Sequence, residues 1–183
     1  SVICNEMANL DLSNYIANRF NDVVISGHAI AVRLRRDVVG ATPQQIRTAM
    51  DGVSRLNPGH FSGSLDYEEI GDVKCGIARF KERTGPKVLW IHGGAFSFGS
   101  ARVYRATAIY LARYFTCEVV MPEYRLSPEH KYPIPFEDCL NVYKELTANG
   151  DDIILIGDSA GGNIAAHLTQ TCIANNLPIP KKL

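Results

Sequence analysis

Apolar residues recur at helical spacing through the first 60 residues of the chain. They fall on about every fourth position over residues 10–24, 30–38 and 42–56, with charged residues between them. No catalytic motif appears in these stretches. We therefore predict a helical cap region over residues 1–60, which either packs against the main domain or forms a lid over a substrate cleft.

Beyond residue 60, short apolar runs alternate with amphipathic stretches. The runs predict strands within residues 67–80, 87–91, 117–121 and 153–156, with a turn at Gly71 and Asp72, and the amphipathic stretches predict helices over residues 101–115 and 136–149 and after residue 160. Such alternation favours right-handed crossovers and ligand sites at the carboxyl ends of the strands. The predicted fold class is α/β, a doubly wound and mostly parallel sheet over residues 61–183.

One strand-to-helix turn carries the pattern of a nucleophile elbow. The run Ile153–Ile156 leads directly into Gly157-Asp158-Ser159-Ala160-Gly161, and a helical spacing follows. Glycines at both ends of G-x-S-x-G let the strand and the helix approach closely, so that the serine projects from the sheet edge. Ser159 is thus the candidate nucleophile and Asp158 a supporting residue. The alternative is a plain serine- and glycine-rich turn.

A second glycine-rich loop, His92-Gly93-Gly94-Ala95-Phe96, follows the run at residues 87–91. Because glycines let the main chain come close to a substrate oxygen, the N–H groups of Gly93, Gly94 and Ala95 are candidate oxyanion donors, together with the N–H of Ala160 after the serine. Both loops lie at the carboxyl ends of predicted strands, so we expect them to form one site.

Composition narrows the partners. The 183 residues carry 19 basic and 19 acidic side chains, so the net charge is zero. Charge therefore gives no reason to expect nucleic acid or an anionic membrane as a partner. No apolar stretch is long enough to span a bilayer. The five cysteines contain no C-x-x-C pair, which favours reduced thiols and a cytoplasmic protein. Nothing in the sequence requires a metal or an organic cofactor.

Three blocks carry a resemblance to a known family. They are residues 92–96 (HGGAF), 123–129 (EYRLSPE) and 157–163 (GDSAGGN). In this order they resemble the hormone-sensitive lipase branch of the α/β-hydrolases, over about residues 65–176. The resemblance implies hydrolysis of carboxylic esters, with Gly94, Ala95 and Ala160 as oxyanion donors and His92 shaping the loop. Ala95 departs from the glycine usual in the family.

The residues after Ser159 lack the rest of a catalytic triad. In this fold the acid and the histidine follow the serine, but the last 24 residues contain no acid and one histidine, His167. His167 lies eight positions along the helix, about 12 Å from Ser159, and cannot serve as the base. We therefore expect a fold that is incomplete at its C-terminus, little activity of this chain alone, and an exposed sheet edge through which copies can associate.

The sequence thus predicts a serine hydrolase that acts on short or medium acyl esters through an acyl-enzyme. Two alternatives stay open: a non-catalytic receptor for small molecules on the same fold, and a hydrolase of amides or formamides. Three aromatic residues, Phe96, Phe98 and Tyr104, either line an acyl pocket or pack within the domain.

Overall fold

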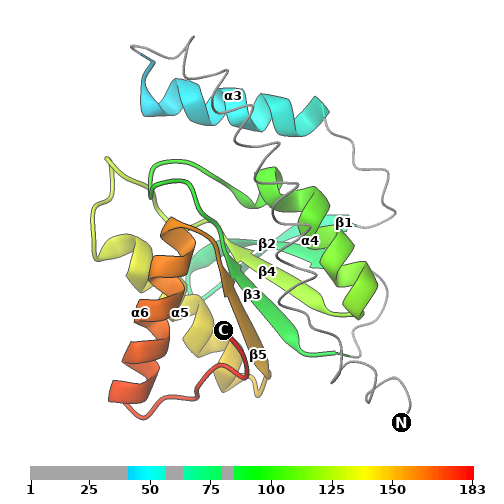
Figure 1. The fold of residues 1–183 in the computed structure, drawn as a ribbon, viewed down its shortest axis with the longest axis vertical. Coiled ribbons are helices and arrows are strands. Elements are labelled where there is room, and N and C mark those ends of the chain that lie inside the picture. Colours follow the sequence, from blue (N-terminus) through cyan, green and yellow to red (C-terminus); the bar gives the residue numbers. More distant parts are fainter. Residues whose placement is uncertain (1–40, 57–63, 80–84) are drawn as a thin grey trace. The chain divides into compact units, whose positions relative to one another are not determined.

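The computed structural model describes residues 41–56, 64–79 and 85–183 (Figure 1). Its elements in chain order are α3 (Pro43–Leu56), β1 (Ser64–Ile70), β2 (Val73–Arg79), β3 (Lys87–Ile91), α4 (Ala101–Phe115), β4 (Glu118–Pro122), α5 (Ile134–Ala148), β5 (Ile153–Gly157) and α6 (Ala160–Ala174). The strands and helices predicted beyond residue 60 are all present.

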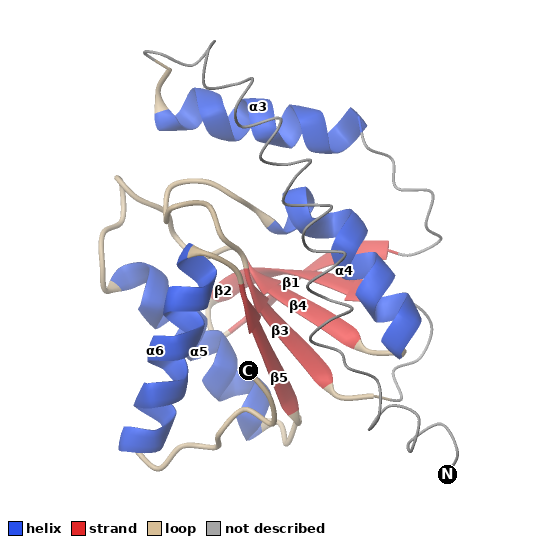
Figure 2. Ribbon diagram, viewed as in Figure 1, coloured by secondary structure: helices blue, strands red, loops and turns tan. Residues whose placement is uncertain are grey.

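The five strands form one sheet in the order β1-β2-β4-β3-β5 (Figure 2). The strands β4, β3 and β5 run parallel, as predicted, whereas β1 and β2 are antiparallel to their neighbours. The sheet is therefore mixed. Gly71 and Asp72 form the predicted turn between β1 and β2, and their φ angles of 60° and 59° are those of a tight two-residue hairpin.

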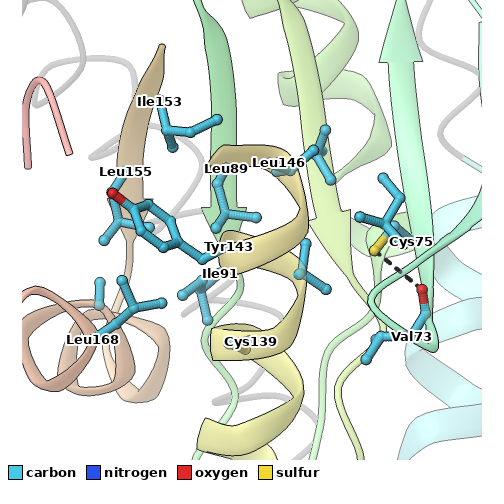
Figure 3. Packing of buried hydrophobic residues seen from close by; sticks show 14 of the residues in the cluster. Val73, Cys75, Leu89, Ile91, Cys139, Tyr143, Leu146, Ile153, Leu155 and Leu168 are labelled. Atoms are coloured by element: carbon cyan, nitrogen blue, oxygen red, sulfur yellow. Dashed lines mark hydrogen bonds between the residues drawn. The ribbon is translucent and has the colours of Figure 1, made fainter. Parts of the chain in front are cut away.

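Helices cover both faces of the sheet, with α4 on one face and α5 and α6 on the other (Figure 2). Successive strand residues point to opposite faces, so Leu89 and Ile91 of β3 join the core under α5 and α6. Tyr143 of α5 and Leu168 of α6 lie in the same core, and both are fully buried (Figure 3). Two-sided burial explains why the parallel strands read as short, continuously apolar runs.

Residues Pro43–Leu183 form one compact unit, which includes α3. The helix predicted over residues 42–56 is confirmed, because α3 runs from Pro43 to Leu56. The helices predicted over residues 10–24 and 30–38 lie outside the described residues. A boundary of the cap region near residue 60 stays a prediction.

The outer edge of β5 is partly covered by the chain itself. The Leu155 N–H donates to the carbonyl oxygen of Lys182 at 2.9 Å, and the Lys181 N–H donates to that of Ile153 at 2.8 Å. Lys182 runs parallel to β5 at this bridge. Over these residues the edge that we expected to be exposed is paired, because the segment after α6 returns to the strand.

Charged side chains join the amino ends of three parallel strands. Glu118 of β4 contacts Arg79 of β2 and Lys87 of β3, and Lys87 reaches Asp151 just before β5 at 2.8 Å. Burial alone would raise the pKa of Glu118, but hydrogen bonds from Arg79 and Lys87 outweigh it and hold the pKa below its ordinary value. The charged form of Glu118 therefore stabilises the fold.

We predict that Glu118→Gln lowers the free energy of unfolding at pH 7 by about 1–2 kcal/mol, because two cations lose a charged partner. Since the pKa of Glu118 is lower in the folded chain than in the unfolded one, its contribution is complete above the unfolded value near 4.5 and is lost as pH falls through the folded value. Urea unfolding at pH 7, 5 and 3 measures this. A difference between variant and wild type that does not shrink below pH 4.5 would contradict the assignment.

Candidate active site

Ser159 lies at the junction of β5 and α6 in a backbone conformation that few residues adopt. Its φ of 52° and ψ of −117° place it outside the ordinary helical and strand regions. Such strain persists only where the surrounding structure enforces it, and it marks functional positions. The Oγ atom makes no hydrogen bond to a described residue. The strand-turn-helix context predicted from the sequence is present.

Two glycines make this turn possible. A Cβ at Gly157 would lie 2.4 Å from the carbonyl oxygen of Gly161, and a Cβ at Gly161 would lie 2.0 Å from that of Ile91 in β3. No side chain fits at either distance. The first turn of α6 therefore rests directly on the backbone at the end of β3, where the second glycine-rich loop begins.

The loop after β3 is a tight backbone turn. Gly94, Ala95 and Phe96 have φ angles of 125°, 51° and 57°, and the N–H groups of Ser97 and Phe98 both donate to the carbonyl oxygen of Gly94. We call residues 93–99 the oxyanion loop, after the role that the sequence predicts for its N–H groups. Ala95 adopts a positive φ although it carries a Cβ.

Asp158 ties the elbow to the oxyanion loop. Its Oδ1 accepts from the Gly93 N–H at 3.0 Å and from Trp90 Nε1 at 3.2 Å, and its Oδ2 accepts from the Tyr104 hydroxyl at 2.7 Å. Burial and the neighbouring Asp158 charge raise the pKa of Tyr104, which keeps the hydroxyl a donor. The carboxylate thus points away from the apex and joins β3, α4 and the elbow.

These contacts separate the expected oxyanion donors into one N–H group that is already hydrogen-bonded and three that are not bonded to any described residue. The Gly93 N–H is engaged by the Asp158 carboxylate, so the donor set proposed below omits Gly93. Within the described residues, no hydrogen bond occupies the N–H groups of Gly94, Ala95 or Ala160. Ala160 is also the first residue of α6, where the helix dipole favours negative charge.

His92 is buried beneath the loop, where it is 1% exposed. Its ring stacks on Tyr124 at 4.3 Å, and its Nδ1 lies 2.8 Å from the carbonyl oxygen of Gly93. Because a carbonyl only accepts, Nδ1 carries the proton. Burial lowers the pKa of His92, against the opposing effects of this hydrogen bond and of Asp158, so the ring is neutral. Such a residue shapes the loop.

One arginine connects α3 to the loops around the site. Arg47 forms a two-pronged ion pair with Glu129, with N–O distances of 3.0 and 2.9 Å. It also donates to the carbonyl oxygens of Ser97, in the oxyanion loop, and Ser127. No local pattern predicts this contact, because the partners of Arg47 lie 50 to 82 positions away in the chain.

The aromatic residues considered for an acyl pocket separate in space. Phe96 lines a cavity of about 200 Å³ beside the oxyanion loop, whereas Tyr104 bonds to Asp158 and stacks edge-on against Trp90. Phe98 is not among the residues that line the cavity. His167 and Phe136, whose rings are in contact, also line the cavity. No sequence pattern indicated that either residue does so.

Comparison with known proteins assigns the family. A family model described as the alpha/beta hydrolase fold matches residues 88–183, more than half of the chain. The chain belongs to the α/β-hydrolase family. The resemblance to its hormone-sensitive lipase branch is confirmed by the crystal structure of an esterase from the bacterial hormone-sensitive lipase family. This structure matches with a TM-score of 0.74 and 28% identity, over 81% of this chain and 52% of the other.

Two curated relatives of this α/β-hydrolase are named as esterases. An esterase of Acinetobacter venetianus is 32% identical over 130 residues, which cover 69% of this chain and 43% of the relative. A versiconal hemiacetal acetate esterase of Dothistroma septosporum is 33% identical over 149 residues, 74% of this chain and 45% of the relative. The chain thus spans less than half the length of either.

Neither a membrane-spanning helix nor a cluster of metal-binding side chains occurs in the described part of this α/β-hydrolase. None of its helices has the length and hydropathy needed to cross a membrane. No three His, Cys, Asp or Glu side chains within it are grouped as metal ligands. Cys75, Cys117, Cys139 and Cys172 are buried free thiols, and burial raises the pKa of each.

We predict that Gly161→Ala lowers the free energy of unfolding by more than about 2 kcal/mol, because its Cβ meets the rigid backbone of β3. Gly162→Ala is the matched control in the same helical turn. Its Cβ would lie 3.3 Å from the carbonyl oxygen of Gly157, and alanine's higher helix propensity of about 1 kcal/mol offsets that contact. Equal effects of both substitutions in urea unfolding would refute the proposed close approach.

Asp158→Ala should cost at least about 2 kcal/mol of stability, since three donors lose their acceptor. Tyr104→Phe, which removes one of the three bonds, should cost less than half as much. The exposed Asp152, paired with Lys181 at 3.3 Å, provides the control, and Asp152→Ala should stay within about 0.5 kcal/mol. Thermal unfolding ranks the three variants. An Asp158→Ala variant as stable as Asp152→Ala would overturn this role.

Proposed function

We propose that this chain carries the nucleophile and the oxyanion donors of a serine hydrolase that cleaves carboxylic esters with short or medium acyl chains. The observation that carries the proposal is the strained Ser159, at the start of α6, next to a loop whose Gly94 and Ala95 N–H groups are not engaged by described residues. The names of the two esterase relatives support ester hydrolysis.

In the proposed reaction, Ser159 Oγ attacks the ester carbonyl carbon and its proton passes to a base. The carbonyl oxygen becomes negative and accepts hydrogen bonds from Gly94, Ala95 and Ala160, and one such donor is typically worth about 3–4 kcal/mol. The alcohol then leaves with a proton, and an acyl group remains on Ser159. Attack of water on this acyl-enzyme by the same steps releases the acid and restores the serine.

We place the base and its acid partner outside this chain. His167 stacks on Phe136 beside the cavity, His92 is buried and neutral, and His130 lies in the loop before α5. None of them bonds to Ser159. The proposal therefore concerns the full-length protein, with a neutral small-molecule ester as substrate. A cytoplasmic location stays a prediction from the sequence.

A fluorophosphonate probe tests the nucleophile directly, because it reacts only with an activated serine. In the full-length protein we expect the probe to label Ser159. The variant Ser159→Ala should not be labelled, and its rate of hydrolysis of 4-nitrophenyl butyrate should be lower by at least about 10³-fold. The control Ser64→Ala alters an exposed serine of β1 and should leave both intact. This chain alone should label far more slowly.

Three outcomes would count against the proposal. A full-length protein that ignores the probe would favour the receptor alternative. Labelling that persists in Ser159→Ala would place the nucleophile at another residue. Turnover of acyl anilides faster than of the matching phenyl esters would favour the amide hydrolase.

A further inference from the structure

Aromatic rings line much of the cavity beside the oxyanion loop. We call it the α5–α6 cavity, and it is bounded by the oxyanion loop, the segment leading into α5 and the first two turns of α6. The rings of Phe96, Tyr132, Phe136 and His167 supply much of its lining. No carboxylate, lysine or arginine is among the described residues that line it. The cavity therefore favours an uncharged group.

Three of these rings are nearly parallel. The ring centroids of Phe136 and His167 are 4.0 Å apart with an interplanar angle of 18°, and those of Tyr132 and His167 are 6.2 Å apart at 24°. Phe136 and His167 each use one ring face to stack on the other, so their edges and remaining faces are what they can present to the cavity. Aromatic groups prefer offset-stacked or edge-on contacts with each other, so this ring surface suits another flat ring. An aliphatic chain gains area from such walls but none of this directional contact.

The volume fits one ring. The cavity measures about 200 Å³, whereas pockets for drug-sized ligands usually hold about 300–1,000 Å³. An apolar cavity of about 150 Å³ in another protein is known to bind benzene. A single six-membered ring therefore fits the α5–α6 cavity.

The cavity is also within reach of Ser159. Ala95, a proposed oxyanion donor, lies in its wall, and so do Asn163 and Ile164 in the first turns of α6. The Asn163 N–H donates to the carbonyl oxygen of Ser159 at 3.1 Å, and four residues of helix span about 6 Å. A group one or two bonds from a carbonyl held at Ser159 can enter the cavity.

We propose that the α5–α6 cavity binds a single aromatic ring of a neutral ester whose carbonyl lies at Ser159. This inference rests on the proposed function for the position of the carbonyl, and on the ring geometry for the nature of the bound group. It makes Phe136 and His167 specificity-determining residues.

Two matched pairs of substrates separate stacking from simple apolar burial in the full-length protein. Benzyl acetate and cyclohexylmethyl acetate place the ring on the alcohol side, and methyl phenylacetate and methyl cyclohexylacetate place it on the acyl side. Each pair has similar intrinsic reactivity, so the aromatic-to-saturated ratio of kcat/KM reports the ring contact. We expect a ratio well above one in one pair, which identifies the side of the ester that enters the cavity.

Phe136→Leu and His167→Leu should each lower that ratio by about three- to tenfold, because they keep apolar volume but remove a ring face. The control Tyr114→Leu removes a half-exposed ring of α4 and should leave the ratio unchanged. Circular dichroism verifies that each variant is folded. Ratios near one in both pairs, or ratios unaffected by Phe136→Leu and His167→Leu, would overturn the proposal in favour of a non-specific apolar pocket.

A binding measurement keeps this test independent of hydrolysis. In saturation-transfer NMR, benzyl alcohol should receive more saturation from the full-length protein than cyclohexylmethanol, and Phe136→Leu should abolish the difference. If the fluorophosphonate probe fails but this difference is found, the proposed function fails and the ring site stands. If the probe labels Ser159 and no difference is found, the ring site fails alone.

Discussion

The structure depends on one backbone contact, between the first turn of α6 and the end of β3. Only a residue without a Cβ can stand at Gly161, where the carbonyl oxygen of Ile91 approaches. This contact brings the start of α6 against the strand from which the oxyanion loop emerges, and it leaves Ser159 at a φ of 52°. Apolar burial on both faces of the parallel strands supplies the free energy that holds the strained turn in place.

Hydrogen bonds to the half-buried Asp158 join the elbow to the loop after β3. Asp158 uses both carboxylate oxygens to hold the Gly93 N–H and the side chains of Trp90 and Tyr104. His92 supports the same loop from below. Because the Gly93 N–H and the side chains of Trp90 and Tyr104 all donate to Asp158, the loop after β3 is held in one conformation, and we propose that its further N–H groups are thereby preorganised for an oxyanion.

Much of this was predictable from the sequence, and the reasons differ by element. The alternation of apolar runs predicted the parallel strands and helices, and the glycines of residues 157–161 predicted the elbow. Both predictions succeed because the local sequence determines these elements. The proposed donor set departs from the sequence expectation at Gly93, because the Gly93 N–H donates to Asp158. Sequence reasoning did not predict the hydrogen-bond partners of Asp158, the contacts of Arg47 with Glu129, Ser97 and Ser127, or the aromatic residues that line the α5–α6 cavity. Those contacts join residues distant in the chain, and no local pattern records which side chains the sheet order brings together.

We propose that Ser159 and three backbone N–H groups form one preorganised site, and a crystal structure of the full-length protein inhibited by a fluorophosphonate would show their arrangement around a bound oxyanion. We expect phosphorus bonded to Ser159 Oγ, with a phosphonyl oxygen about 3 Å from the nitrogens of Gly94, Ala95 and Ala160. The Gly93 N–H should stay on Asp158. A phosphonyl oxygen directed to solvent or to the Gly93 N–H, or an adduct on another residue, would contradict it.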